Sequence, residues 1–151
     1  MKSIILAAGK GTRLGSLTKE KPKCMVNVAG IPLLKYQIEI LKSCNIKNIN
    51  IITGYLSSMV KFPNTKIYLN KNFATTNMVN TLFTAKEEIN DESDVIISYG
   101  DIIYSREILA QLIKSDNPIS ITIDTKWRDY WSQRMANPLD DAETLKIDRN
   151  G

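Results

Sequence analysis

Short apolar runs alternate along the chain with stretches in which apolar residues recur at helical spacing. Five runs have the length and β-branched content of buried strands. They are residues 4–8, 49–53, 66–69, 94–98 and 119–123. The run at 94–98 is wholly apolar at its centre, as strands buried in a parallel sheet are. A shorter extended piece is expected at 25–28.

The stretches between these runs predict helices. Apolar residues mark one side of the expected helices at 33–44 and 106–114, and Ser105 has a side chain suited to cap the latter. A short helix is expected at 56–60, and a longer one at 77–89. The residues expected on one packing face of the 77–89 helix are Met78, Val79, Leu82, Phe83, Lys86 and Ile89.

This alternation predicts a three-layer α/β/α, Rossmann-like fold around a mostly parallel sheet. Ligands bind such sheets at the carboxyl ends of the strands. Turns follow three of the expected strands directly, with Gly9 after the first, Gly54-Tyr55 after the second and Gly100-Asp101 after the fourth. We therefore expect these turns to open onto one edge of the sheet, where a ligand binds.

The first of these turns has the composition of an anion-binding loop. Residues Gly9–Arg13 read Gly-Lys-Gly-Thr-Arg, and glycines let consecutive backbone N–H groups approach and wrap an anion. Lys10 and Arg13 add positive charge. Lys23 follows after a loop, and Pro22 stiffens the chain just before it. This pattern predicts a cradle for a triphosphate with an ammonium group delivered to it.

Two familiar phosphate-binding motifs do not fit the loop. The Walker motif needs four residues between its glycines, whereas only Lys10 separates Gly9 from Gly11. The dinucleotide motif needs Gly-x-Gly-x-x-Gly, whereas Gly15 comes one position late and no helical pattern follows directly. The plain alternative is a glycine turn after a core strand.

Composition and charge indicate one globular domain over residues 1–151. The chain is 43% hydrophobic, and 20 Lys and Arg against 16 Asp and Glu give a net charge of +4. This small excess suits an anionic substrate and does not favour nucleic acid. No run approaches the ~20 apolar residues that span a bilayer, and the start lacks a secretory signal pattern. We expect a cytoplasmic protein without membrane insertion, and the oligomeric state stays open.

The absent residue types exclude several chemistries. The sequence has no histidine and two isolated cysteines, Cys24 and Cys44, so it offers no zinc site and no Ser-His or Cys-His nucleophile. Both thiols are expected to be reduced, with Cys44 on the apolar face of a helix. A reaction without a general base fits better. Attack by a phosphate monoester is one, because its second pKa of about 6 leaves it ionised near pH 7.

Asp101 is the candidate metal ligand. The sequence Tyr99-Gly100-Asp101 directly follows the buried run at 94–98, beside the predicted phosphate cradle. Mg²⁺ prefers carboxylate and phosphate oxygens, so Asp101 is expected to bind it. The alternative is a turn aspartate that caps the loop at 102–106.

The polar loop at 72–77 has a structural and a binding interpretation. Thr76 or Asn77 can cap the following helix. An asparagine amide also has the donor and acceptor needed to read a pyrimidine edge. The two interpretations are equally supported.

Both tryptophans lie shortly after the fifth run. Trp127 and Trp131 are four residues apart, with Tyr130, Asp124 and Asp129 beside them. Aromatic faces with nearby carboxylates favour a quaternary ammonium or an amine. The alternative is that both rings pack on the sheet from one face of a helix.

Three segments together resemble the nucleotidyltransferases of the sugar-nucleotide-pyrophosphorylase type. They are Leu6–Leu14, Lys21–Lys23 and Val28–Leu34. The resemblance implies the nucleotide-diphospho-sugar transferase fold, with Lys23, Arg13 and Asp101 as catalytic residues and Asp101 as the ligand of Mg²⁺. The residues that it implies for nucleotide binding are Leu6, Ala7, Ala8, Gly9, Lys10, Gly11, Thr12, Arg13, Lys23, Thr76, Asn77 and Gly100.

The tryptophan segment looks like the phosphocholine cytidylyltransferase branch of that family. It reads Asp-x-x-Trp-x-x-x-Trp-x-x-Arg from Asp124 to Arg134, and then Asn-Pro-Leu-x-Asp-Ala-Glu. The resemblance implies that Asp124, Trp127 and Trp131 contact the acceptor. The expected reaction transfers a cytidylyl group from CTP to phosphocholine, or to a similar amino-alcohol phosphate or phosphonate, and releases pyrophosphate. The alternatives are a sugar-1-phosphate nucleotidyltransferase that uses UTP or dTTP, and a non-catalytic nucleotide-binding module.

The last residues suggest an incomplete domain. Residues 145–148 read as a strand, and Asn150-Gly151 is a strong hairpin turn signal, yet no second strand follows. Members of the resembling family continue past this point and return a further metal-binding carboxylate. The chain is therefore expected to be the N-terminal, incomplete part of a nucleotidyltransferase domain.

Overall fold

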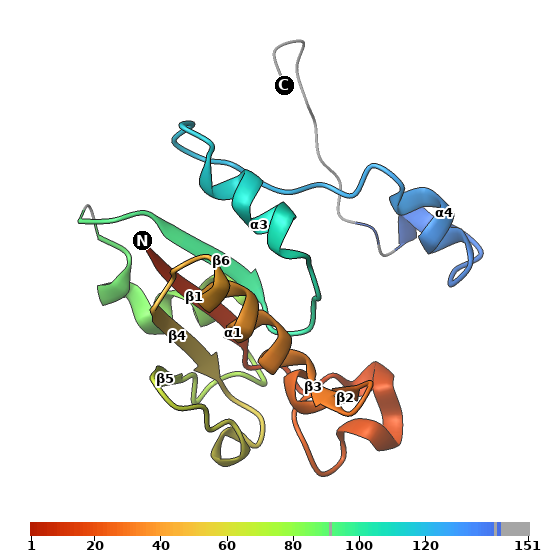
Figure 1. Cartoon of the computed structure of the whole chain (residues 1–151). Helices are drawn as coiled ribbons and strands as arrows, with labels where there is room; N and C mark the ends of the chain where they lie inside the picture. The colour runs from red at the N-terminus through yellow and green to blue at the C-terminus, as the bar shows by residue number, and fades with distance from the viewer. Residues whose placement is uncertain (91, 141, 143–151) are drawn as a thin grey trace. The chain divides into compact units, whose positions relative to one another are not determined.

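Four parallel strands form the sheet on which the candidate site is built. The computed structural model of the protein describes residues 1–90, 92–140 and 142, and the chain divides into two compact units, Met1–Ser115 and Asp116–Gly151. The strands of the first unit are β1 (Lys2–Ala7), β4 (Asn48–Thr53), β5 (Thr65–Leu69) and β6 (Val95–Tyr99). Their order is β5-β4-β1-β6, and every neighbouring pair is parallel (Figure 1). Four of the five predicted strands are thus confirmed.

Helical elements cover both faces of this sheet. The helices α1 (Leu33–Ser43) and α3 (Arg106–Ile113) confirm two predicted helices. Ser105 Oγ caps α3 by accepting a hydrogen bond from the Ile108 amide at 3.4 Å, as predicted. The other face carries α2 (Met78–Leu82) and the 3₁₀ segment η4 (Phe83–Glu88).

The core is split into two apolar clusters because alternate residues of a strand point to opposite faces. On the side of α1 and α3, the buried residues include Ile5, Ile51, Leu34, Ile38, Leu41 and Leu109. On the side of η4, they are Ile4, Ile52, Tyr68 and Ala85. Sheet and helices therefore form the predicted three layers.

Shorter elements connect the sheet to the helices. They are the 3₁₀ segments η1 (Thr12–Thr18), η2 (Lys23–Met25) and η3 (Ser57–Met59) and the paired strands β2 (Asn27–Val28) and β3 (Ile31–Pro32). The last two form an antiparallel hairpin rather than the single extended piece expected at 25–28. Its turn residues Ala29 and Gly30 have φ of 50° and 82°, which is the left-handed conformation that two-residue hairpins require.

The predicted packing face of the 77–89 helix is correct at Leu82, which packs against the core, and wrong at its other apolar residues. Met78, Val79 and Phe83 are exposed, and the side chains that turn inward are Thr81, Ala85 and Glu88. The helix also changes to 3₁₀ geometry after Leu82, with non-helical angles at Ala85. Two polar residues are buried here because each has specific hydrogen-bond partners, which the apolar periodicity did not reveal.

The fifth predicted strand is also wrong. The residues at 119–123 are not assigned to a strand, and Ile119, Ile121 and Ile123 are 87%, 62% and 55% exposed. Alternation alone does not make a strand, because a strand also needs a hydrogen-bonded neighbour. The hairpin expected at 145–151 lies outside the described residues.

The described residues of the second unit contain two short helical elements. These are α4 (Trp127–Ser132) and the 3₁₀ segment η5 (Pro138–Asp140). Trp127 and Trp131 therefore lie on one helix, as the alternative interpretation of this segment expected. Across the residues that the structure describes, no helix is both long and apolar enough to cross a membrane.

A buried carboxylate, Glu88, links η4 to β5. Glu88 is 8% exposed, and its Oε1 accepts hydrogen bonds from the Tyr68 hydroxyl at 2.6 Å and the Lys66 ammonium at 2.9 Å. Lys2 Nζ lies 3.7 Å from the other carboxylate oxygen. The Tyr68 hydroxyl, followed by Lys66, lowers the pKa of Glu88 because both stabilise its ionised form.

We expect Glu88→Ala to destabilise the protein by about 1–3 kcal/mol near pH 7, because it leaves the buried Tyr68 hydroxyl without its acceptor. The folded-state pKa of Glu88 lies below its ordinary value of 4.5. Its ionised carboxylate therefore stabilises the fold above that value, and this contribution is lost as the pH falls through the folded-state pKa. Urea unfolding of wild type and variant across this range measures the difference. Glu87→Ala, at an exposed neighbour, is the control, and an equal loss in both variants would contradict the assignment.

Candidate active site

The carboxyl ends of four strands bring four turns to one edge of the sheet. The turns predicted after β1, β4 and β6 meet here, and the turn after β5 joins them. Backbone hydrogen bonds tie neighbouring turns together. These bonds run from Tyr55 N–H to Ala8 O (3.0 Å), from Gly100 N–H to Leu6 O (2.8 Å) and from Asn70 N–H to Thr53 O (2.8 Å).

The glycine loop after β1 is held in one shape by its own contacts. Gly11 has φ 69° and ψ 42° and Gly15 has φ 56°, a backbone region that favours glycine. Thr18 is buried, and its hydroxyl donates to the Gly11 carbonyl at 3.0 Å. The predicted cradle residues that this leaves exposed are Gly9, Lys10, Thr12 and Arg13. A ligand can therefore reach a loop whose conformation is already set.

The three residues before the loop are less accessible. Ala7 and Ala8 are buried and Leu6 is half-buried, because they form the end of β1 or directly follow it. The predicted nucleotide contact at these positions stays a prediction.

Lys23 lies against the glycine loop. A Cβ atom on Gly11 would lie 2.8 Å from Lys23 Cβ, so the lysine stem fits only because residue 11 has no side chain. Pro22 is buried and extended just before η2. The Lys23 ammonium forms an ion pair with a carboxylate oxygen of Asp101.

Asp101 reaches this loop because Gly100 packs on β1. A Cβ atom on Gly100 would lie 2.8 Å from Ala7 Cβ and 3.1 Å from Leu6 O. The turn after β6 therefore sits directly against the end of β1. The structure thus brings together Lys23 and Asp101, two predicted catalytic residues that are 78 positions apart in sequence.

The residues at this edge fit a divalent metal only in combination with a phosphorylated ligand. Asp101 is half-buried, and its carboxylate is paired with the Lys23 ammonium. Among the described residues, no group of three or more His, Cys, Asp or Glu side chains is close enough to hold a metal ion. Mg²⁺ commonly uses one or two carboxylates together with substrate phosphates, and Asp101 beside the glycine loop meets that requirement.

Thr76 and Asn77 both have structural partners. Asn77 Oδ1 caps α2 by accepting from the Asn80 amide at 3.0 Å, and Thr76 Oγ1 donates to the Asn72 carbonyl at 2.9 Å. The predicted cap is therefore present. Asn77 remains exposed beside the same edge, so capping does not remove it from contact with a ligand.

Asn70 organises this polar loop and was missed by sequence reasoning. It is 6% exposed, and its amide nitrogen donates to Thr76 Oγ1 and Thr81 Oγ1, both at 3.0 Å. Its Oδ1 accepts from the Asn72 amide at 2.9 Å. The available signal was a polar residue placed directly after the run at 66–69.

An aromatic pair connects the turn after β4 with the glycine loop. The Tyr55 and Phe73 rings lie 6.3 Å apart, and Lys10 Nζ lies 5.5 Å from the centre of the Tyr55 ring. The Tyr55 hydroxyl donates to the Lys19 carbonyl at 2.9 Å. Tyr55 thus contacts both ends of the segment that carries the cradle, a role that the sequence did not indicate.

The tryptophan segment is a separate cluster within the second unit. Trp127 and Trp131 are half-buried, and each ring has an arginine guanidinium 4.9 Å from its centre, Arg128 and Arg134 respectively. Asp124 is exposed, and its carboxylate accepts from the Lys126 amide at 2.8 Å. The contacts to these rings are thus made by the protein's own arginines, and binding of an ammonium group by this segment stays a prediction.

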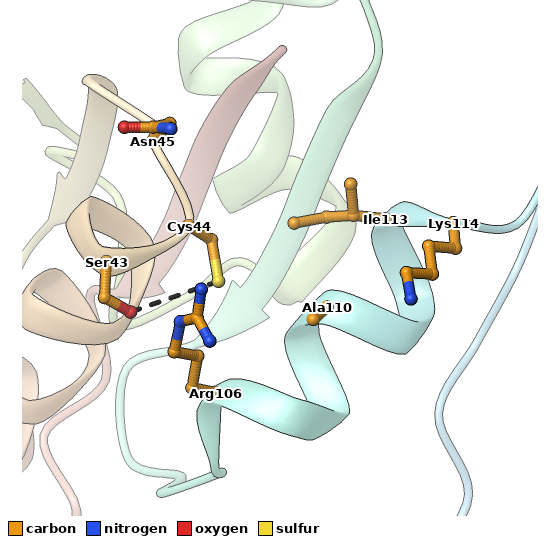
Figure 2. A pocket seen from close by; sticks show the side chains of 7 residues that line it. All are labelled: Ser43, Cys44, Asn45, Arg106, Ala110, Ile113 and Lys114. Atoms are coloured by element: carbon orange, nitrogen blue, oxygen red, sulfur yellow. Dashed lines mark hydrogen bonds between the residues drawn. The ribbon is translucent and has the colours of Figure 1, made fainter.

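Neither cysteine is one of the candidate site residues at the carboxyl edge of the sheet. Both are free thiols, and burial raises the pKa of Cys24 to about 12, so it stays protonated. Cys44 follows α1 directly and packs against the core, as predicted. Cys44 lines a hollow of about 230 Å³, and Figure 2 shows the lining side chains at the end of α1 and along α3. The described residues that line this hollow include none of the predicted site residues.

The parallel α/β fold and the residues gathered at this edge are those of the nucleotidyltransferase class. The chain belongs to the family described as the MobA-like NTP transferase domain, which it matches over residues 3–139.

Two curated relatives are cytidylyltransferases. The CTP:phosphoglutamine cytidylyltransferase of Campylobacter jejuni is 42% identical over 97% of this chain and 62% of its own length. The choline-phosphate cytidylyltransferase of Streptococcus pneumoniae is 43% identical over 59% of this chain and 41% of its own length. The chain thus spans about two fifths to three fifths of these relatives.

Solved structures agree with the observed fold. The CTP:phosphocholine cytidylyltransferase from Streptococcus pneumoniae superimposes with a TM-score of 0.63 at 35% identity, covering 70% of this chain and 49% of that one. The inositol-1-phosphate CTP transferase from T. maritima has a TM-score of 0.61 at 21% identity, covering 77% and 49% respectively. The second likeness bears on the fold alone.

Proposed function

We propose that this protein transfers a cytidylyl group from CTP to the phosphate or phosphonate of a small amino compound and releases pyrophosphate. The observation that carries the proposal is the meeting of Lys23 and Asp101 beside an exposed glycine loop at the carboxyl edge of the sheet. The names of the curated relatives support CTP as the donor. Residues 1–151 would then form the N-terminal part of the transferase domain.

The transfer itself needs no protein nucleophile. An oxygen of the acceptor phosphate attacks the α-phosphorus of CTP, and the bond from that phosphorus to the bridging oxygen breaks. The departing pyrophosphate takes the electron pair. A phosphate that is ionised near pH 7 needs no general base, which agrees with a sequence that contains no histidine.

The residues of the edge would bind and orient the reacting phosphates. Backbone donors at Gly9, Gly11 and Thr12 would hold the β- and γ-phosphates, and Arg13 would neutralise the departing pyrophosphate. The Lys23 ammonium would stabilise charge between the α-phosphate and the acceptor phosphate. Such catalysis depends on positioning and preorganised charge.

Asp101 would hold a divalent ion, Mg²⁺ in our proposal, together with the nucleotide phosphates. When bound, that ion supplies positive charge to the phosphate oxygens. The other nucleotide contacts that we propose involve Leu6, Ala7, Ala8, Lys10, Thr76, Asn77 and Gly100.

We propose the tryptophan segment as the contact for the acceptor's amino group. Trp127 and Trp131 offer aromatic faces, and Asp124 offers an exposed carboxylate. Relatives are named for phosphoglutamine, choline phosphate and 2-aminoethylphosphonate. All three names describe a phosphorus group on a nitrogen-containing compound, which is the class of acceptor that this segment suits.

A panel assay of the intact protein tests the proposal. Pyrophosphate release would be followed with CTP, UTP or dTTP, each paired with phosphoglutamine, phosphocholine, 2-aminoethylphosphonate or glucose 1-phosphate. We expect turnover with CTP and an amino acceptor, in the presence of Mg²⁺. Preference for UTP or dTTP with the hexose phosphate would instead establish the sugar-phosphate alternative. Calorimetric binding of CTP without turnover of any pair would establish the non-catalytic alternative.

A further inference from the structure

Gln37 is a fully buried amide in the layer of α1 that faces β6. Its exposure is 0%, and the residues packed around it in α1 include Leu34, Ile38 and Leu41. An unpaired amide in such surroundings is costly, so its hydrogen-bond partners show why a polar group is accommodated there.

The described hydrogen-bond partners of the Gln37 side chain lie in one five-residue segment, 98–102, which includes the end of β6 and the turn that follows it. The amide nitrogen donates to the carbonyls of Tyr99 and Ile102, each at 2.8 Å. The amide oxygen accepts from the hydroxyl of Ser98 at 3.1 Å. The two carbonyls flank Gly100-Asp101 on either side, so one side chain joins the beginning and the end of the turn that carries the candidate metal ligand.

The bond from Ser98 also fixes which way the amide faces. A hydroxyl that donates to the amide oxygen directs the NH₂ group, which has two donors, toward the turn. Both of those donors are then used by the two carbonyls. From the other side, Gly100 packs on Ala7 and donates to Leu6 O. The turn is therefore held between β1 and α1.

We infer that Gln37 is a positioning residue, which keeps the Asp101 carboxylate turned toward Lys23 and the nucleotide phosphates. This inference rests on the proposed function. Within the part of the chain that the structure describes, the side-chain hydrogen bonds of Gln37 run to β6 and the turn after it, and not to the glycine loop. Its loss should therefore weaken metal-dependent binding while leaving metal-free nucleotide binding intact.

Asn50 provides a matched control. It is also 0% exposed, and its amide nitrogen donates to the Ser3 carbonyl at 3.1 Å and to Asn48 Oδ1 at 3.0 Å. It lies in the half of β4 away from the carboxyl edge. Replacing Asn50 therefore also removes buried side-chain hydrogen bonds, as replacing Gln37 does, but at the end of the sheet away from Asp101.

The test compares Gln37→Met with Asn50→Leu in the intact protein. Electron paramagnetic resonance would measure free Mn²⁺ during titration in the presence of a non-hydrolysable α,β-methylene analogue of CTP. We expect Gln37→Met to weaken Mn²⁺ binding about tenfold, the lower end of what supporting partners of a metal ligand contribute. We expect Asn50→Leu to stay within about twofold of wild type, and analogue binding in EDTA to be unchanged in both.

Ser98→Ala is a milder second variant, in case Gln37→Met does not fold. Removing the hydroxyl releases the orientation of the amide, so we expect a smaller weakening of Mn²⁺ binding in the same direction. Wild-type affinity in a folded Gln37→Met or Ser98→Ala protein, or an equal loss in Asn50→Leu, would overturn the inference. Turnover by the wild-type protein distinguishes failure of the inference about Gln37 from failure of the proposed function. If wild type turns over CTP, such a result concerns Gln37 alone, whereas absence of wild-type turnover overturns the proposed function.

Discussion

Replacing Lys23 by alanine is expected to lower kcat for cytidylyl transfer by about 10²–10³, the typical cost of removing one preorganised charge-stabilising group. The glycine at position 11 gives the lysine stem room beside the cradle, and its ammonium faces Asp101. An alanine would keep the Cβ atom beside Gly11 and remove the ammonium together with the rest of the stem. Steady-state pyrophosphate release at saturating CTP measures the effect.

Lys35→Ala is the control for this variant. Lys35 also forms an ion pair, with Glu39 at 3.7 Å, but on an exposed turn of α1. We expect its kcat to equal that of wild type. Turnover near the wild-type rate in Lys23→Ala would remove Lys23 from the mechanism.

Asp101→Asn is expected to have an effect of similar size, about 10²-fold or more, because a developing phosphate charge would lose its metal-supported stabilisation. The amide has the shape of the carboxylate and lacks its charge, so the turn after β6 should keep its conformation. Initial rates over a range of Mg²⁺ concentrations would show a much weakened metal dependence. Asp94→Asn, at the exposed opposite end of the same strand, should leave both rate and metal dependence unchanged. Wild-type metal dependence in Asp101→Asn would rule out Asp101 as the metal ligand.

The ion pair between Lys23 and Asp101 should contribute little to folding. The two side chains are 39% and 33% exposed, and pairs with this much contact with water contribute about 0–1 kcal/mol. Both variants should therefore unfold at nearly the wild-type temperature. A large loss of activity with nearly unchanged stability is the combination expected for a functional pair, and it contrasts with the loss of stability expected at Glu88.

Several features of the site could be predicted from sequence because they depend on local chemistry. The glycine loop, Lys23 after Pro22 and Asp101 after an apolar run are each defined by neighbours in the chain. The parallel direction of the strands then follows from strand–helix alternation, and it brings the ends of those runs to one edge. Four strands, α1, α3 and the cap at Ser105 were therefore predicted correctly.

The remaining features depend on partners far away in the chain. The inward face of α2 and η4 could not be read from apolar spacing, because Thr81 and Glu88 are buried through bonds to Asn70 and Tyr68. The residues at 119–123 alternate like a strand, yet a strand exists only when a neighbour supplies hydrogen bonds.

Local patterns were sufficient to predict the parallel α/β fold, the glycine loop, Lys23 and Asp101, because each has a signal within a few positions of the chain. How Lys23 and Asp101 come together depends on the packing of strands and turns that are distant in sequence. Gln37 reads in sequence as a polar position within a helix. Its contact with the Asp101 turn exists only in the folded protein, where α1 packs against β6. The side-chain amide of Gln37 then donates to carbonyls 62 and 65 residues away. A buried side-chain amide needs hydrogen-bond partners. Here the partners are distant in sequence, so the residues next to Gln37 in the chain do not predict them.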